Sequence, residues 1–323
     1  MEDLKMTPFH SAIFGLDPST CQNERYVRTV SISMPLNTKT GAPANPTDIS
    51  RGIFGATVGI DRLLKLWDKY NIKATWFTPA HSAESFPKQI RKIVDAGHEI
   101  GLHGYTHEFV STLNEKQQRD VLDKSIRVLT DIVGKKPRGW TAPAWSTSKE
   151  IVRLLEESGI EYDHSFMHHD SQPYYLPDPS LSTYTETDTS KDASHWMHPM
   201  TTLKPSSIVE IPANWHLDDW PPFQLSLSQP STHGFVDTAV IERLWKEQFE
   251  FHYRECPEDG TFVFPISIHP QVSGKPQVIL LHERLIEWIN GHEGVEWVTM
   301  EQIVDQFKSG KLAGVTVEGG ADV

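Results

Sequence analysis

The sequence predicts an α/β protein whose parallel strands, seven or eight of them, close into a barrel. Two observations predict this. Short apolar or β-branched runs recur along the 323 residues, and each is bounded by turn residues. Helical patterns, with apolar residues spaced three or four positions apart, lie between these runs. Strands and helices that alternate in this way form parallel βα units, and this number of strands favours closure over an open sheet.

Individual elements follow from the same patterns. Two helical stripes are clear, one of Ile60, Leu63, Leu64 and Trp67, the other of Leu122, Ile126, Leu129 and Val133. The expected strands are residues 29–34, 74–77, 99–103, 139–141, 160–162, 209–213, 262–269 and 295–298.

Two segments interrupt the alternation, and both are expected to be long loops. Residues 35–52 are rich in Pro, Asn, Thr and Gly, and residues 166–207 show little periodicity. The second segment is rich in aromatic residues, so we expect it to be ordered over the mouth of the barrel. The chain then divides into an N-terminal extension (1–26), one barrel domain (27–309) and a frayed C-terminal tail (310–323).

Composition excludes several classes of function. The net charge is −13 and no run is rich in Lys or Arg, which argues against a nucleic-acid partner. No apolar run approaches the roughly 20 residues of a membrane-spanning helix, so no membrane partner is expected. The N-terminus lacks the pattern of a secretory signal, and the two cysteines, Cys21 and Cys256, make no disulfide framework. We therefore expect a cytoplasmic protein.

His103 and His107 are the first candidates for chemistry. They follow the apolar run 99–103, and therefore lie where barrel active sites gather, at the carboxyl end of a strand. Two imidazoles four residues apart, with Gly104 allowing a tight turn, can converge on one divalent ion whose bound water becomes a nucleophile. The alternative is a pair of loop histidines without a ligand.

His269 is the second candidate, because it ends the most apolar run in the chain. It can act as a general acid that protonates a leaving nitrogen, or it can be a hydrogen-bonded core histidine. Asp163, Asp218 and Asp219 also follow expected strands. Each can orient an imidazole, or only cap a helix or loop.

These pieces occur in one order along the chain, and the sequence resembles the NodB-homology polysaccharide deacetylase family, also called carbohydrate esterase family 4. It is most similar to the cytoplasmic branch with peptidoglycan-deacetylase-like proteins, cyclic imide hydrolases and metal-independent allantoinases. The resemblance runs from about residue 27 to residue 307. The motifs that carry it are Asp48-Ile-Ser-Arg-Gly52, Ala74-Thr-Trp-Phe77 with Pro79 and His81, Ala96-Gly-His-Glu-Ile-Gly101, His103-Gly-Tyr-Thr-His107-Glu108, Tyr162-Asp-His-Ser165, Glu210-Ile-Pro-Ala-Asn-Trp215 with Leu217-Asp-Asp219, and Ser267-Ile-His-Pro270.

The resemblance implies a distorted (β/α) barrel of the NodB-homology type and hydrolysis of a non-peptide carbon–nitrogen bond. In typical members one Asp is the catalytic base, a second Asp and two His bind zinc or a similar ion, and a late His is the general acid. His103 and His107 match the metal histidines, and His269 matches the late His. Close relatives form homo-oligomers, and we expect the same here.

The sequence departs from the family at the first motif. Where the family has Asp-x-Asp, alignment through residues 48–52 puts Pro35 and Asn37. Asn37 offers a neutral carbonyl oxygen to a metal, but the anionic ligand that holds zinc firmly is missing. A metal-independent form is therefore an alternative to a zinc enzyme. Candidates to supply the missing base are His81, Glu108 and the histidines of residues 166–207.

Three functions follow. The first is hydrolysis of a small-molecule amide, cyclic imide or ureide, with His269, Asp163 and Asp219 as catalytic residues. The second is metal-dependent N-deacetylation of a polysaccharide or peptidoglycan. The third is a non-hydrolytic protein that reuses the pocket. Four residues are expected to contact a substrate, with core packing as the alternative for the tryptophans: His81, Trp140, Trp145 and Trp215.

Overall fold

The computed structural model describes residues 25–26, 29–31, 46–182, 184–225, 234–256 and 260–320. The predictions for the N-terminal extension up to residue 24, and those for Pro35 and Asn37, lie outside the described residues. None of the helices in the described part of the chain is long and apolar enough to span a membrane.

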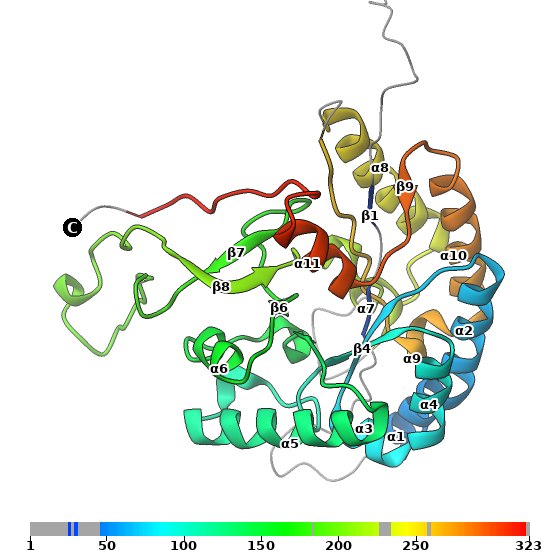
Figure 1. Cartoon of the computed structure of the whole chain (residues 1–323), viewed down its shortest axis with the longest axis horizontal. Helices are drawn as coiled ribbons and strands as arrows, with labels where there is room; N and C mark the ends of the chain where they lie inside the picture. Colours follow the sequence, from blue (N-terminus) through cyan, green and yellow to red (C-terminus); the bar gives the residue numbers. More distant parts are fainter. Residues whose placement is uncertain are drawn as a thin grey trace, which may run out of the picture.

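A seven-stranded sheet runs through the centre of the molecule, with helices around it (Figure 1). The strand order is β2-β3-β4-β5-β6-β8-β7, and every neighbouring pair is parallel except β7 with β8. Two further strands, β1 and β9, form a separate parallel pair. The bounds are β1 (Arg25–Tyr26), β2 (Thr29–Ser31), β3 (Thr75–Thr78), β4 (Glu99–Leu102), β5 (Gly139–Trp140), β6 (Tyr162–Asp163), β7 (Tyr174–Pro177), β8 (Pro205–Glu210) and β9 (Val295–Glu296).

Helices connect most of the parallel strands, as the alternating pattern predicts. A π-helical segment, η2 (Gly55–Gly59), joins the first two helices. The helices are α1 (Pro46–Phe54), α2 (Ile60–Lys69), α3 (Ala80–Ser85), α4 (Pro87–Asp95), α5 (Glu115–Val133), α6 (Ile151–Glu157), α7 (Trp220–Phe223), α8 (Thr238–Glu255), α9 (Pro270–Ser273), α10 (Pro276–Ile289) and α11 (Met300–Lys308).

Local sequence explains the longest helix, α5. Asn114 and Gln117 form a capping box at its start, in which each side chain accepts a hydrogen bond from the other residue's backbone amide. Gly134 ends it with a φ of 82°, which glycine adopts without a steric penalty. The buried face carries Leu122 and Leu129, so the stripe predicted from the sequence is confirmed.

A glycine lets the strands that carry the site pack closely. A Cβ atom at Gly139, the first residue of β5, would lie 1.9 Å from Cζ of Tyr162 on β6. The Tyr162 ring therefore crosses the start of β5, and its hydroxyl donates a 2.5 Å hydrogen bond to Glu99 at the start of β4. This packing aligns β4, β5 and β6, whose carboxyl ends carry His103, Thr141 and His164.

The predicted strand 262–269 is wrong as a regular strand. Its apolar residues are buried, but the segment joins its neighbour by an isolated bridge between Ser267 and Asp218. Backbone hydrogen bonds run from the Ser267 amide to Leu217 and from the Asp219 amide to Ser267. The segment is thus extended and lies beside 217–219 without a longer ladder, which makes the barrel irregular here.

The two predicted loops need correction as well. Residues 46–52 belong to α1, which begins at Pro46, a residue with a φ suited to the first helical turn. Residues 166–207 contain β7 and the start of β8, paired antiparallel with a register irregularity between Tyr175 and Pro177. The long connection between these strands lies at the left of the molecule in Figure 1.

The C-terminal segment is packed, and the expectation of a frayed tail is wrong for its described part. It runs beside β7 and β8 (Figure 1), where the Val315 amide donates to Pro173 and the Leu203 amide donates to Gly319. Leu312 is buried in the core. The α/β class with seven to eight strands is confirmed, since the main sheet has seven strands.

Candidate active site

His103 and His107 lie directly after β4, at the carboxyl edge of the sheet. Their ring centroids are 4.8 Å apart, with the rings edge to face. Nδ1 of the buried His103 ring donates to the Thr141 carbonyl over 2.8 Å, so the neutral ring carries its lone pair on Nε2. Burial lowers the pKa of His103 well below its usual value and that of His107 to about 4. Both imidazoles are therefore neutral at pH 7, the form that binds a metal ion.

The loop between these histidines has an unusual backbone. Gly104 and His107 both have positive φ values, 68° and 66°. For His107 this conformation is strained, and the surrounding contacts must hold it. The Glu108 carboxylate does so by accepting hydrogen bonds from the Tyr105 amide (2.9 Å) and the Thr106 amide (2.6 Å). Glu108 is thus engaged in shaping the loop, which leaves it poorly placed to serve as the missing base.

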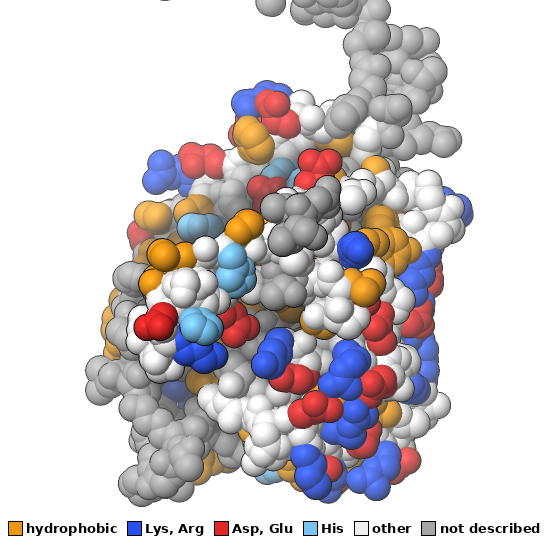
Figure 2. All heavy atoms as spheres, turned by 90° about the vertical axis from the view of Figure 1, so that its left-hand side faces the viewer, with side chains coloured by type: hydrophobic (Ala, Val, Ile, Leu, Met, Phe, Trp, Pro, Cys, Tyr) orange, Lys and Arg blue, Asp and Glu red, His pale blue; other side chains and the backbone are white. Residues whose placement is uncertain are grey.

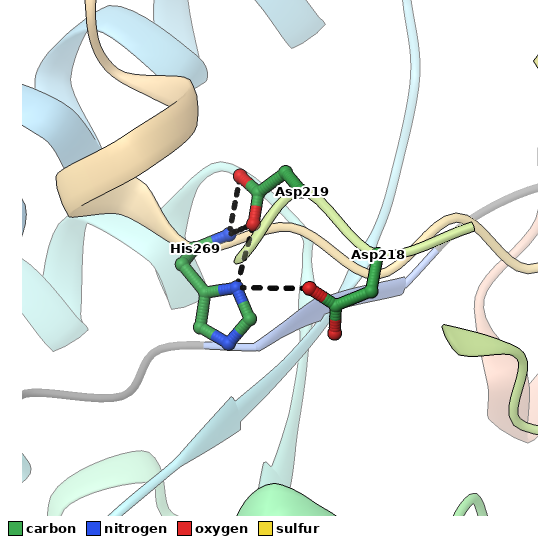
Figure 3. Close-up of side chains that lie close together, drawn as sticks. All are labelled: Asp218, Asp219 and His269. Atoms are coloured by element: carbon green, nitrogen blue, oxygen red, sulfur yellow. Dashed lines mark hydrogen bonds and ion pairs between the residues drawn. The ribbon is translucent and has the colours of Figure 1, made fainter. Parts of the chain in front are cut away.

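His269, which precedes α9, and Asp219, which precedes α7, form a buried pair (Figure 3). Nδ1 of His269 lies 2.7 Å from Oδ1 of Asp219, and the His269 backbone amide also points at this carboxylate, 3.0 and 3.1 Å from its two oxygens. Ser273, on α9, donates a further hydrogen bond to Oδ2 and contacts Nε2 of His282 over 2.8 Å. The Asp219 carboxylate therefore fixes the orientation of the His269 ring.

Asp218 lies on the other side of the same imidazole nitrogen, with Oδ1 3.8 Å from Nδ1 of His269. The Trp220 amide donates to this oxygen over 2.6 Å. Burial raises the pKa of Asp218 to about 7, although the nearby His269 acts in the opposite direction. Burial alone would lower the pKa of His269, but the charges of Asp218 and Asp219 outweigh it and raise that pKa.

Asp218, Asp219 and His269 offer ligand atoms within 4.8 Å of one another, a grouping that could hold a metal ion. Its chemistry fits a metal poorly, because both oxygens of Asp219 already accept hydrogen bonds from His269 and Ser273. Nδ1 of His269 also carries the proton that it shares with Asp219. The pair His103 and His107 fits a divalent ion better, since both rings are neutral and one is oriented by a backbone carbonyl.

His269 interacts electrostatically with the pair His103 and His107. A charge on His269 lowers the pKa of both His103 and His107, so the three imidazoles lie near one another. The structure thus brings together three residues that are far apart in the sequence, at the carboxyl ends of the strands, where the sequence predicted them.

Asp163 has a different environment from the one predicted. It pairs in register with Glu210 of β8, and both carboxyl groups are fully buried. Asp163 accepts hydrogen bonds from the His164 amide and from Oγ of Ser165, both over 2.6 Å. Glu210 accepts from the amides of Ser165 and Phe166, both over 2.8 Å.

The remaining oxygens of this pair, Oδ2 of Asp163 and Oε2 of Glu210, have no donor among the described residues other than the partner carboxyl. Two buried acceptors can pair only if they share a proton. In agreement, burial raises the pKa of Asp163 to about 7 and that of Glu210 well above its usual value. The hydrogen bonds that this pair accepts hold residues 163–166 in place at the end of β6.

His164 is a residue of the site that sequence reasoning did not single out. Its Nδ1 donates to the Ile211 carbonyl over 2.7 Å, and its Nε2 lies 3.2 Å from Oγ of Ser267. The ring stacks on Phe77 and meets the edge of Trp145. Its position at the end of an expected strand was the available signal.

The predicted substrate-contacting residues divide into three environments. Trp145 lies beside His164, and its ring centroid is 4.4 Å from that of the half-exposed Trp215. Trp145 also has a strained positive φ of 49°. Trp140 is 2% exposed and belongs to the main hydrophobic core, which leaves little of its side chain for a ligand. His81 packs against Tyr105 on the loop of the histidine pair.

The chain is similar to several known proteins. The sequence model of the family described as polysaccharide deacetylase matches residues 55–162. The chain is 47% identical to a peptidoglycan deacetylase of Helicobacter pylori over 267 residues, which cover 83% of this chain and 89% of the relative. It is 41% identical to the peptidoglycan deacetylase-like protein FGM2 of Gibberella zeae, over 81% of this chain and 78% of the relative.

Two solved structures share the fold. A protein from Mycobacterium smegmatis assigned as a polysaccharide deacetylase superposes with a TM-score of 0.71 at 25% identity, covering 96% of this chain and 97% of that one. The PuuE allantoinase superposes with a TM-score of 0.70 at 23% identity, covering 90% and 92%. The second likeness concerns the fold alone.

Proposed function

The chain belongs to the polysaccharide deacetylase family, whose members are hydrolases of carbon–nitrogen bonds, and from that premise we propose that it hydrolyses an amide-type bond of a small molecule: an N-acyl amine, a cyclic imide or a ureide. The observation that carries this proposal is the buried Asp219–His269 pair beside two neutral imidazoles. Membership of a hydrolase family opposes the non-hydrolytic alternative.

His269 acts as the general acid. Because Nδ1 is held by Asp219, the second ring nitrogen, Nε2, is the one that gives its proton to the leaving nitrogen. The two flanking carboxylates raise the pKa of His269, so the ring is protonated more readily at neutral pH. Asp219 is a positioning residue in this scheme, since it acts through the imidazole.

Asp218 is our candidate for the general base. The first-motif carboxylates are missing in any alignment, because no Asp or Glu occurs between Glu24 and Asp48. Asp218 lies next to His269. The pKa of its carboxyl group, about 7, allows Asp218 to take a proton from water near neutral pH. The water oxygen then attacks the carbonyl carbon, the carbon–nitrogen bond breaks, and the leaving nitrogen takes the proton of His269.

His103 and His107 are the residues that would hold a divalent ion. When bound, zinc or a similar ion supplies Lewis-acid polarisation of the carbonyl oxygen. Two imidazoles without an anionic ligand bind zinc weakly, so we propose that the protein's affinity for zinc is low and that turnover does not require an equimolar ion.

The test is a turnover assay on three substrate panels: N-acetylated amino sugars, cyclic imides and ureides, each with and without added zinc. Release of acid or amine from any panel by the wild type, with a large loss in His269→Gln, supports the proposal. A wild type that is inactive on all three panels under both conditions excludes it.

A second candidate, metal-dependent N-deacetylation of a glycan, is favoured by the 47% identity to a protein named peptidoglycan deacetylase. It requires tight metal binding. Acetate release from an N-acetylated glycan that depends on zinc, together with equimolar zinc after dialysis against a chelator, would favour it over the first candidate.

A further inference from the structure

Three cationic side chains gather where α1, α2 and the start of α10 meet. Arg51 lies in the last turn of α1, Arg62 lies in the first turn of α2, and Lys275 directly precedes α10. The Phe54 ring contacts two of them, since Nζ of Lys275 lies 3.6 Å from its centroid and Cζ of Arg62 lies 5.7 Å from it. Both distances allow a cation–π contact. One aromatic ring therefore keeps two positive charges close together.

Close backbone packing fixes these side chains relative to one another. A Cβ atom at Gly59, the last residue of η2, would lie 2.4 Å from the Pro270 carbonyl oxygen on α9. A Cβ atom at Gly274 would lie 2.6 Å from Cα of Gly59. Nη1 of Arg62 donates a hydrogen bond to the Gly274 carbonyl over 2.8 Å. The segments that carry Arg62 and Lys275 are therefore in direct contact and cannot separate freely.

The positive charges act on one another. Burial and the charges of Arg62 and Arg51 lower the pKa of Lys275. Nη1 of Arg51 donates to the Leu225 carbonyl over 3.0 Å, which holds this guanidinium beside the segment that follows α7. Like charges that the fold holds close together repel, so a bound anion would be favourable here.

Carboxylates do not balance two of these cations. Asp61 directly precedes Arg62, but its side chain accepts a hydrogen bond from Lys92 over 2.8 Å. Within the part of the chain that the structure describes, neither Arg62 nor Lys275 forms an ion pair with Asp or Glu. Acidic residues are plentiful, since the net charge is −13. On the face shown in Figure 2, Lys and Arg side chains lie next to Asp and Glu side chains, so charges of one sign are not the rule on this surface.

From this arrangement we propose that Arg51, Arg62 and Lys275 form a binding site for a phosphate group. The oxygens of a phosphate accept hydrogen bonds from guanidinium and ammonium groups together. A phosphate also brings about two negative charges, whereas a carboxylate brings one. Free phosphate and a phosphorylated small molecule share this chemistry. The site requires no turnover, and it therefore goes beyond the proposed hydrolysis.

The test is isothermal titration of the full chain with inorganic phosphate at neutral pH and low ionic strength. The protein is first dialysed against a chelator, so that phosphate cannot bind through a metal ion. Contacts with three cations should give saturable binding with a Kd of about 1 mM or tighter. Lys275→Gln and Arg62→Gln should each weaken binding by roughly five- to tenfold, the effect of one charge-assisted hydrogen bond.

Lys88→Gln is the matched control, because Lys88 is an exposed lysine on α4 without an ion pair among the described residues. It should bind phosphate as the wild type does. Phosphate should also raise the melting temperature of the wild type and of Lys88→Gln, and leave that of Lys275→Gln nearly unchanged. If Arg62→Gln does not fold because the Gly274 carbonyl loses its donor, Lys275→Gln alone carries the test.

A second titration, with glycerol 3-phosphate, identifies the source of the phosphate group. Tighter binding than that of inorganic phosphate indicates a phosphorylated small molecule, and equal or weaker binding indicates free phosphate. The absence of saturable binding with both probes overturns the proposal. So does phosphate binding that is equal in Lys275→Gln and Lys88→Gln, or acetate that binds as tightly as phosphate.

Discussion

Nδ1 of His269 lies 2.7 Å from Oδ1 of Asp219, and the same carboxylate accepts the backbone amide of His269. One buried carboxylate thus holds both the ring and the main chain of the residue that we assign as the general acid. The contact fixes the orientation of the ring and leaves Nε2 as the nitrogen that donates to a leaving group. Substitutions around this pair separate the roles that we propose.

Asp219→Asn should lower kcat and shift the alkaline limb of the pH–rate profile to lower pH. The carboxylate raises the pKa of His269, so its removal lets the imidazole lose its proton at a lower pH. The pH profile of kcat/KM measures this. Ser273→Ala removes one hydrogen bond to the same carboxylate and should leave the limb nearly unchanged. An unshifted alkaline limb in Asp219→Asn contradicts the assignment.

Asp218→Asn should remove the acidic limb of the profile and lower kcat by roughly 10²- to 10⁴-fold, the usual contribution of a positioned acid or base. The wild type should gain activity as the pH rises through about 7, where the Asp218 carboxyl loses its proton. If Asp218→Asn keeps the acidic limb and most of its rate, the base is another group.

Glu210→Gln should change how stability depends on pH. In the wild type, burial raises the pKa of Asp163 from 3.8 to about 7, and that of Glu210 in the same direction. The folded state therefore binds the shared proton more tightly than the unfolded chain does. This stabilisation is complete below about pH 4 and is lost as the pH rises through about 7, by up to about 1.4 kcal/mol per pH unit for each proton.

The side-chain amide introduced by Glu210→Gln can donate to Asp163 without a shared proton, so the variant should lose less stability than the wild type between pH 5 and pH 8. Urea unfolding across this range measures the difference. Parallel stability curves for the two proteins would show that the pair does not share a proton.

Zinc should bind weakly. Dialysis against a chelator is expected to remove it, and His103→Gln should abolish the affinity that remains, because the proposed donor set contains two imidazoles and no carboxylate. Metal analysis by mass spectrometry and a zinc titration followed by calorimetry provide the test. Equimolar zinc that resists the chelator, with activity lost when it is finally removed, would contradict weak binding and favour the metal-dependent deacetylase.

The sequence predicts the local part of this structure well. The stripes of α2 and α5 and the position of His103 after β4 follow from periodicity and from the rule that strand ends carry barrel chemistry. It could not predict which carboxylate meets which group. Asp219 reaches His269 across 50 positions, and Asp163 meets Glu210 through strand register, which only the tertiary structure sets.

The misplaced elements have similar causes. β7 was missed because Tyr174–Pro177 is short, ends in proline and is stabilised by its antiparallel neighbour β8. The 262–269 run is as apolar as a strand, but its backbone pairs with 217–219 only at one bridge. Trp140 and Trp145 are close in sequence, yet one lies on a buried strand and the other in a strained turn beyond it.

The most direct test of the central claim compares leaving groups. If His269 protonates the leaving nitrogen, the loss of activity in His269→Gln depends on how much that nitrogen needs a proton. On the acetamide of an alkyl amine or amino sugar, kcat/KM should fall by roughly 10²- to 10⁴-fold, whereas on the acetamide of 4-nitroaniline, a weakly basic leaving group, the fall should be several-fold at most. An equal fall on both substrates would contradict the assignment of His269 as the general acid.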